Sequence, residues 1–135
     1  MYQGIYTIKE NKKIAKDVFK MIVEGDTSAL TATGQFVNLK IDGLYLRRPI
    51  SVCDYDDSTI TLIYKVVGAG TEIMSTRVAG EKFDVLVGLG NGYNTDKSGE
   101  NPLLIGGGVG VPPMYGLCKK LIAEGKKPTV ILGFN

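Results

Sequence analysis

The chain has 135 residues, a net charge of +2 at neutral pH and 44% hydrophobic residues. Its 22% of charged residues is ordinary for a folded domain, so the composition argues against intrinsic disorder. No run of like charges exceeds Lys126-Lys127, which leaves no basic footprint for nucleic acid or for an anionic membrane. No apolar run approaches the roughly 20 residues of a membrane helix, and the N-terminus lacks the pattern of a signal peptide. We therefore expect a cytoplasmic protein.

The numbers of histidine, cysteine and glycine residues limit which catalytic and metal-binding functions the chain can have. The chain has no histidine, which removes the commonest general base and metal ligand. Its two cysteines, Cys53 and Cys118, are too far apart in sequence to seed a metal site, so we expect two reduced, unpaired thiols. The 18 glycines are about twice the usual share. They cluster at 68–70, 88–92 and 106–110, where the chain must turn sharply or approach another group closely.

The first hundred residues carry the pattern of short antiparallel strands. β-branched and aromatic runs, separated by turn residues, predict strands over 2–9, 18–23, 35–41, 48–53, 59–66 and 83–87. Strands of this length and spacing are typical of a small β-barrel, which we assign to a domain over 1–98. Between the last two strands, residues 70–77 suit a short helix with Thr71 as its N-cap.

After about residue 100 the pattern changes to a single βαβ unit. Strands are predicted over 102–105 and 129–132, as expected of a buried parallel sheet. Between them, Pro112 and Pro113 suit the first turn of a helix that stops near Gly125. The spacing of apolar residues predicts a buried helix face made of Val111, Met114, Tyr115, Cys118, Leu121 and Ile122.

Residues 99–135 would thus form a partial parallel α/β nucleotide-binding domain. An open sheet of this kind normally has two such halves, and the sequence contains one. A two-stranded sheet covered on one face is too small to be stable alone. We therefore expect a homo-oligomer that forms through the incomplete sheet.

The glycine-rich turn before this helix is a candidate phosphate site. A strand that feeds such a turn and then a helix aims backbone N–H groups at the helix N-terminus, where the dipole favours a pyrophosphate. Gly107, Gly108 and Gly110 are the candidate residues, although Pro113 takes the position of the third glycine in the G-x-G-x-x-G pattern. The alternative is a tight turn required only for helix–strand packing.

Two further segments suit a phosphate or a flat ring. Arg48-Pro49-Ile50-Ser51 combines a cation able to grip phosphate with Ile50, which could pack on a ring, and Ser51, which could donate to a ring nitrogen. An arginine pair beside proline is also common at a solvated strand end. Ile63-Tyr64-Lys65 offers an aromatic face and a charge, and Gly70-Thr71 opens the short helix. Together these sites predict a long ligand with a diphosphate and flat rings.

In their order along the chain these motifs resemble the ferredoxin-reductase-like flavoproteins. They are 48–51, 63–65, 70–71, Leu89-Gly90-Asn91-Gly92-Tyr93 and 106–113. Within that family the sequences of these motifs are most similar to those of the electron-transfer subunits of NAD-linked dihydroorotate dehydrogenase. One departure is Gly88, where the family usually has proline.

The resemblance implies a set of cofactors and partners. FAD would be bound by Arg48, Pro49, Ile50, Ser51, Ile63, Tyr64, Lys65, Gly70 and Thr71, and NAD would be received at Gly107, Gly108 and Gly110. Electrons would pass between NAD and a dihydroorotate dehydrogenase catalytic subunit in pyrimidine biosynthesis. The family's 2Fe–2S cluster needs four cysteines near the C-terminus, so we expect no cluster in this chain, which would be C-terminally truncated. Alternatives are a non-catalytic flavin- or nucleotide-binding fragment and a flavin subunit that serves sulfide or ferredoxin.

Overall fold

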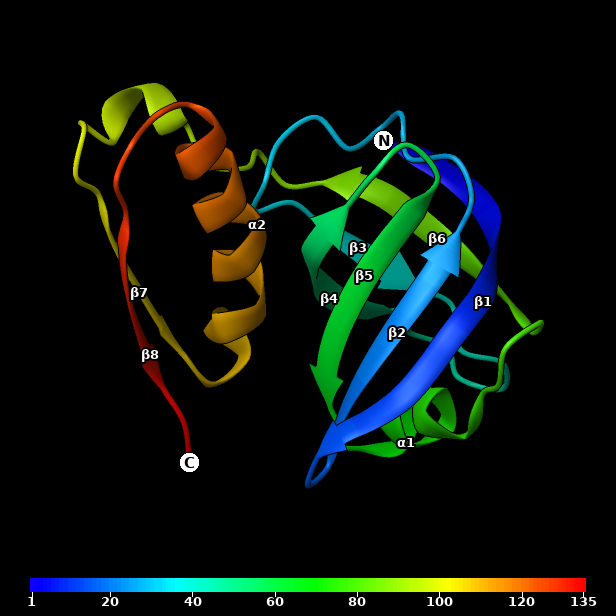
Figure 1. The fold of residues 1–135 in the computed structure, drawn as a ribbon. Helices are drawn as coiled ribbons and strands as arrows, with labels where there is room; N and C mark the ends of the chain where they lie inside the picture. The colour runs from blue at the N-terminus through cyan, green and yellow to red at the C-terminus, as the bar shows by residue number, and fades with distance from the viewer.

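A barrel and a small α/β unit make up the computed structural model, which describes residues 1–135 (Figure 1). Six antiparallel strands close the barrel in the order β1-β2-β5-β4-β3-β6. Their bounds are β1 Tyr2–Ala15, β2 Val18–Glu24, β3 Phe36–Leu39, β4 Arg48–Tyr55, β5 Thr59–Lys65 and β6 Lys82–Leu89. All six predicted strands are present. β1 is longer than predicted because its second half pairs with β2 in a hairpin.

The barrel interior is filled by alternate side chains of the strands. In β5, for example, Ile60, Leu62 and Tyr64 are buried while their neighbours are partly exposed. This two-residue period places one face of each strand in the core and the other on the surface. The core cluster also takes in Met74 of α1 (Ala69–Thr76), so this helix packs against one end of the barrel.

The start of α1 differs from the prediction. The N-cap is Gly68, and Thr71 is the third residue of the helix. The Thr71 hydroxyl oxygen still accepts hydrogen bonds from the backbone N–H groups of Val67, at 2.8 Å, and Gly68, at 3.2 Å. The prediction of Thr71 as the N-cap was therefore wrong. Thr71 lies inside the first turn of the helix, and from there its side chain accepts hydrogen bonds from the two residues that precede the helix.

The second unit is the predicted βαβ arrangement. β7 (Leu103–Gly107) and β8 (Thr129–Gly133) pair in parallel, with Leu103 opposite Thr129 and Ile105 opposite Ile131. The connection consists of a 3₁₀ turn, η2 (Gly108–Gly110), and the helix α2 (Val111–Ala123), whose first turn contains the two prolines. A second 3₁₀ turn, η1 (Thr95–Lys97), precedes β7 and was not predicted. The domain boundary at 98/99 falls in this connection and stays a prediction.

Helix α2 lies between the barrel and the two-stranded sheet (Figure 1). Met114, Leu117 and Leu121 pack with Leu104 of β7 in a small separate core. The predicted buried face was therefore partly wrong: Tyr115 is 55% and Ile122 59% exposed, whereas Leu117, which was not predicted, is buried. The sequence pattern describes one apolar stripe, but this helix contacts a neighbour on each of two sides.

Helix α2 comes close to the barrel because the residue that faces β4 is a glycine. A Cβ atom at Gly116 would lie 2.7 Å from the backbone oxygen of Cys53 in β4. Beside it, Lys119 Nζ lies 2.6 Å from Asp54 Oδ2. The missing side chain lets the helix backbone approach the strand, and this fixes how the second unit sits on the barrel. Neither α1 nor α2 has the length and apolar character of a membrane-spanning helix.

Candidate functional site

Arg48, the first residue of β4, lies across the start of helix α1. A Cβ atom at Gly70 would come within 2.8 Å of Arg48 Cγ, so the absence of a side chain at Gly70 lets the arginine lie where it does. Arg48 Nη1 donates to the backbone oxygen of Leu46 at 2.5 Å. The first N–H groups of a helix have no intrahelical acceptor and carry the positive end of its dipole. A guanidinium beside them creates a positive surface that suits an anion such as a diphosphate.

The neighbouring arginine has a different role. The Arg47 guanidinium donates to the backbone oxygens of Asn38 and Asp84, at 3.3 and 3.2 Å, and to Asp84 Oδ1 at 3.0 Å. Burial opposes ionisation of Asp84, but hydrogen bonds from Arg47 and Gln3 outweigh it and lower the pKa of the carboxyl group. Arg47 therefore ties β3, β4 and β6 together, and Arg48 alone is available to a ligand.

The outer surface of β4 and β5 begins next to Arg48. Pro49 and Ser51 are exposed, whereas Ile50 packs against the barrel core. Since β4 and β5 are antiparallel neighbours, the outward side chains of Pro49 and Ser51 share a face with those of Ile63 and Lys65. This face offers an apolar surface and a hydroxyl group, as a flat polar ring requires. Ile50 supports this face from inside the barrel.

Tyr64 is held firmly in the barrel wall. Its ring stacks on Phe19, with 5.8 Å between the centroids, and its hydroxyl donates to Asn11 Oδ1 at 2.9 Å. Burial raises the pKa of Tyr64 to about 12. Asn11 in turn donates to the backbone oxygens of Met74 and Arg77, so it links the tyrosine to helix α1. Sequence reasoning missed Asn11, because one asparagine in a lysine-rich hairpin gives no signal.

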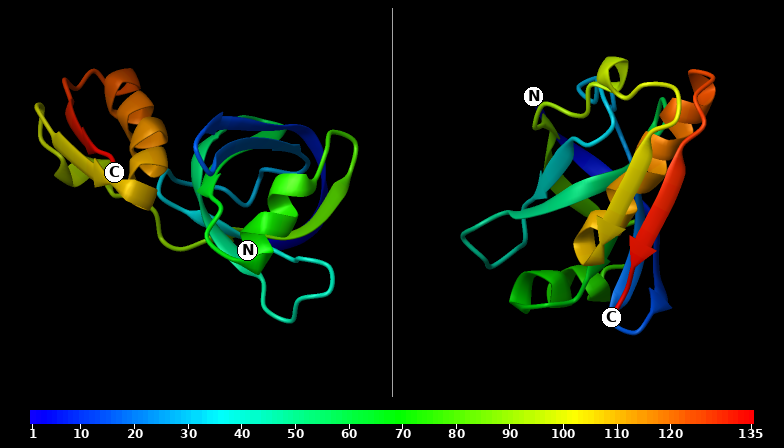
Figure 2. Two further views of the ribbon diagram at one scale, coloured as in Figure 1. Left: turned by 90° about the horizontal axis from the view of Figure 1, so that it is seen from below. Right: turned by 90° about the vertical axis from the view of Figure 1, so that its left-hand side faces the viewer.

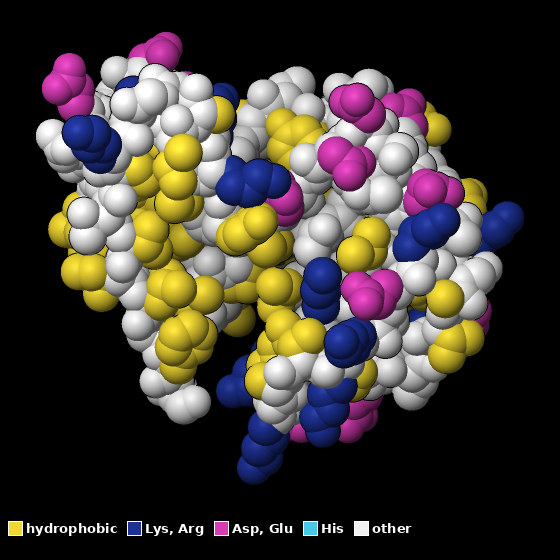
Figure 3. All heavy atoms as spheres, viewed as in Figure 1, with side chains coloured by type: hydrophobic (Ala, Val, Ile, Leu, Met, Phe, Trp, Pro, Cys, Tyr) yellow, Lys and Arg dark blue, Asp and Glu magenta, His cyan; other side chains and the backbone are white.

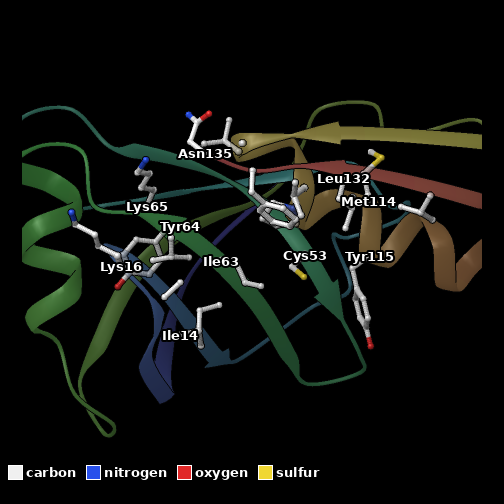
Figure 4. Close-up of a pocket in the computed structure, with 18 of the residues that line it drawn as sticks. Ile14, Lys16, Cys53, Ile63, Tyr64, Lys65, Met114, Tyr115, Leu132 and Asn135 are labelled. Atoms are coloured by element: carbon white, nitrogen blue, oxygen red, sulfur yellow. The ribbon is translucent and has the colours of Figure 1, made fainter.

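A cleft of about 860 Å³ separates the barrel from the second unit. Of its 19 lining residues, 14 are hydrophobic. Figure 3 shows the hollow, with hydrophobic side chains along it and lysines on the barrel side of its mouth. In Figure 4 the labelled barrel residues Ile14, Cys53 and Ile63 lie across the cleft from Met114 and Leu132. The sequence did not predict the contributions of Ile14 and Leu132, because they come from the two ends of the chain.

The glycine turn opens onto this cleft. Gly108, which lines the cleft, has a positive φ of +54°. Cβ atoms at Gly107, Gly108 or Gly110 would meet no atom within 4 Å, so packing does not explain these glycines. A Cβ at Gly106, by contrast, would lie 2.9 Å from the backbone oxygen of Gly110. Packing therefore accounts for Gly106, whereas the other three glycines leave open space at the N-terminus of α2.

The structure brings the predicted residues together in two neighbouring places. Arg48, Gly70 and Thr71 meet at the start of α1, and Ile63, Tyr64, Lys65 and Gly108 line the cleft. Both cysteines are free and also line the cleft, and burial raises the pKa of Cys53 to about 11. Three or more potential metal-binding side chains gather nowhere in the chain.

Comparison with known proteins identifies relatives over nearly the whole chain. No protein-family model matches it. The "Dihydroorotate dehydrogenase B (NAD(+)), electron transfer subunit" of Fusobacterium nucleatum is 43% identical over 96% of the chain and 53% of the relative. Proteins of the same name from Bacillus mycoides and Enterococcus faecalis are 41% and 40% identical, over 95% and 98% of the chain. The chain spans about half the length of these curated relatives.

Solved structures show the same architecture. An NADH-dependent reduced ferredoxin–NADP oxidoreductase matches 98% of the chain and 49% of its own, with a TM-score of 0.87 and 31% identity. The ferredoxin reductase of carbazole 1,9a-dioxygenase also reaches a TM-score of 0.87, over 99% of the chain, at 19% identity, which supports the fold alone. The predicted barrel with a partial nucleotide-binding unit is confirmed. By sequence the chain is similar to the electron-transfer subunits of dihydroorotate dehydrogenase B, of which it covers about half, and its fold is that of ferredoxin-reductase-like proteins.

Proposed function

We propose that this chain is the FAD-binding part of an electron-transfer subunit that works between NAD and a dihydroorotate dehydrogenase catalytic partner in pyrimidine biosynthesis. The observation that carries the proposal is the placement of Arg48 across Gly70 at the start of α1. Arg48 begins β4, whose exposed face with β5 leads to the apolar cleft at Ile63 and Lys65. A ligand with a diphosphate in its middle and a flat ring at one end matches that sequence of surfaces.

The residues present fit FAD on three counts. Gly70 leaves the space that a Cβ would fill, so the Arg48 guanidinium can reach a diphosphate at the helix N-terminus. Pro49 and Ile63 offer apolar surface to a ring system, and the Ser51 hydroxyl can donate to a ring nitrogen. The cleft, which is mostly apolar with a few polar groups, has the character of a cofactor site.

The chain itself supplies position and electrostatics. Bound FAD would supply the redox chemistry, which exchanges a hydride with NAD and single electrons with a partner. Arg48 would hold the diphosphate, and the rigid wall formed by Tyr64 and Phe19 would keep β5 in place behind the ring. Hydride exchange needs no side-chain base, which agrees with the absence of histidine.

The nicotinamide nucleotide would enter from the side of the second unit. Gly107, Gly108 and Gly110 leave open space at the N-terminus of α2, where backbone N–H groups suit a phosphate. Cys53 and Cys118 are the only cysteines, so these 135 residues cannot hold a cluster that needs four cysteine ligands. The cytoplasmic location stays a prediction.

The visible spectrum of the purified protein tests the proposal. We expect a yellow protein whose flavin absorbance bleaches on addition of NADH. Arg48→Ala should weaken FAD binding about ten- to a hundredfold, since a hydrogen bond to a charged group contributes roughly 1.5–3 kcal/mol. Lys9→Ala, on the outer surface of β1, is the matched control and should leave the affinity unchanged. A colourless protein that takes up no added FAD would contradict the proposal.

Two observations favour narrower or different functions. Because the chain spans about half of its curated relatives, a flavin-binding module without NADH reactivity is the second candidate. Such a module would stay yellow when NADH is added. The 31% identity to a reduced ferredoxin–NADP oxidoreductase favours a ferredoxin-type acceptor as the alternative partner. Reduction of ferredoxin, without activity toward a dihydroorotate dehydrogenase catalytic subunit, would support that assignment.

A further inference from the structure

The loop between β3 and β4 carries the most exposed aromatic side chain of the protein. Tyr45 is 99% exposed and its neighbour Leu46 is 66% exposed. Single exposed hydrophobic residues are common on protein surfaces, so exposure alone carries no argument. The position of this loop in the fold does, because contacts at both of its ends tie it to arginines that lie next to helix α1.

Contacts at each end hold the loop beside α1. At its start, Asp42 Oδ2 lies 3.6 Å from Arg77 Nη2, and Arg77 directly follows the helix. At its end, the backbone oxygen of Leu46 accepts a hydrogen bond from Arg48, whose side chain crosses Gly70. Figure 2 shows the loop projecting from the barrel on the side of α1. The loop is therefore held at both ends, whereas the Tyr45 ring makes almost no contact with its own protein.

The proposed FAD surfaces follow strand β4 toward this loop. Cys53 lies at the cleft, Pro49 and Ser51 are exposed along the strand, and Arg48 begins it. Five residues of extended strand span roughly 16 Å, so only an elongated ligand can reach from the cleft to Arg48. With the flavin ring at the cleft and the diphosphate at Arg48, the adenosine end of a bound FAD would lie at the β3–β4 loop.

We propose that Tyr45 is the stacking platform for the adenine of FAD. The proposal rests on the proposed flavin function and assigns the nucleotide end of the same site. A tyrosine ring stacks on any base, because every base has a π-face, and it loses little side-chain entropy on doing so. Since the ring contacts almost nothing in the free protein, stacking breaks no existing contact. Leu46, exposed beside it, adds apolar surface to the edge of the platform.

Three ligands separate this role from others. FAD contains the flavin, the diphosphate and the adenine; ADP contains the last two; and FMN lacks the adenine. Affinities for each would be measured by flavin fluorescence or by calorimetry with the wild-type protein, Tyr45→Ala and Tyr45→Phe. Ile5→Ala, which removes an exposed hydrophobic side chain on β1, is the matched control.

We expect Tyr45→Ala to weaken FAD and ADP binding by about tenfold or more, and to leave FMN binding unchanged. Tyr45→Phe retains the ring and should stay within about twofold of the wild type, as should Ile5→Ala.

An equal loss of FAD and FMN affinity overturns the assignment, because the tyrosine would then act through the structure of the whole site. Unchanged FAD and ADP affinities overturn it as well, and leave flavin binding intact with Tyr45 free to contact another macromolecule. If the wild-type protein takes up neither flavin, the proposed function itself fails.

Discussion

Two adjacent arginines show how much of the site depends on single side-chain directions. Arg47 donates three hydrogen bonds into β3 and β6, whereas Arg48 lies across α1. Sequence alone predicted a phosphate-binding arginine here, and the resemblance to flavoproteins pointed to Arg48. The contact between Arg48 and Gly70, 22 positions later, could not be predicted, because it depends on how the closed barrel places α1 against the start of β4.

The two arginines should therefore separate stability from binding. Arg47→Ala leaves Asp84 without its main partner, so we expect the free energy of unfolding to fall by about 1.5–3 kcal/mol. Arg48→Ala removes one exposed hydrogen bond, to Leu46, so it should lower that free energy by less, about 0.5–1 kcal/mol, while FAD affinity falls. Urea unfolding of the flavin-free proteins measures the first effect. Equal destabilisation by both changes would contradict this division of roles.

Two buried tyrosines make the stability of the protein depend on pH in the alkaline range. Burial raises the pKa values of Tyr6 and Tyr64 from 10.0 to about 12. A group whose folded pKa is raised contributes stability at low pH and loses it as the pH rises. The free energy of unfolding should thus decline between about pH 10 and pH 12. Denaturant titrations across this range test the decline, and Tyr64→Phe should show a shallower one. A constant free energy of unfolding up to pH 12 would show that the pKa values of these tyrosines are not raised by burial.

At the scale of elements, Gly116 determines how close α2 comes to the barrel. Alanine at this position would place its Cβ 2.7 Å from the backbone oxygen of Cys53, which cannot move as a side chain can. Overpacking of this kind costs about 1–3 kcal/mol, and the gain in helix propensity of about 1 kcal/mol offsets only part of it. The exposed Lys119–Asp54 pair contributes little in compensation.

We therefore expect Gly116→Ala to lower the thermal midpoint and to loosen α2. Hydrogen exchange would show faster exchange for the amides of Val111–Ala123 than in the wild type. The matched control is Gly110→Ala: its φ of −81° suits alanine and its Cβ would meet no atom within 4 Å. A stabilised Gly116→Ala variant would show that the helix moves away from β4 without cost.

The elements were predictable where a single period dominates and were mispredicted where two partners compete. β-branched and aromatic runs between turn residues indicated all six barrel strands, and the proline pair marked the start of α2. The buried face of α2 was partly wrong because the sheet and the barrel both contact it, so Leu117 is covered and Tyr115 is left at the cleft. The N-cap of α1 was wrong because glycine can begin a helix without a side-chain cap.

At the scale of the whole molecule, the cleft depends on contacts that no local pattern encodes. Its walls combine the β1–β2 hairpin near Ile14, the face of β4 and β5, the start of α2, and β8. The ordered motifs indicated the ligand class, since each motif is local. The shape of the cleft follows from the way Gly116 and Leu117 hold α2 between two neighbours, which is a property of the folded chain.

The small sheet has one face and two edges without a partner. Helix α2 covers Leu104, and on the opposite face Leu103, Ile105 and Ile131 are exposed, Ile105 by 68%. β7 and β8 pair only with each other, so each also presents a free edge. Parallel sheets are normally covered on both faces, and free apolar edges promote association. The 135-residue chain by itself is therefore expected to form a homo-oligomer through this surface.

Sedimentation velocity on the 135-residue chain would test this association. We expect a homo-oligomer, and Ile105→Lys together with Ile131→Lys should shift it to monomer, because charges on an apolar contact surface oppose association. Val78→Lys, which places the same charge at an exposed apolar position after α1, is the control and should leave the oligomer intact. The substituted chain should still bind FAD, since its barrel is unchanged. A wild-type chain that stays monomeric at high concentration, with slow amide exchange in both β7 and β8, would show that the two strands and α2 are stable without a partner.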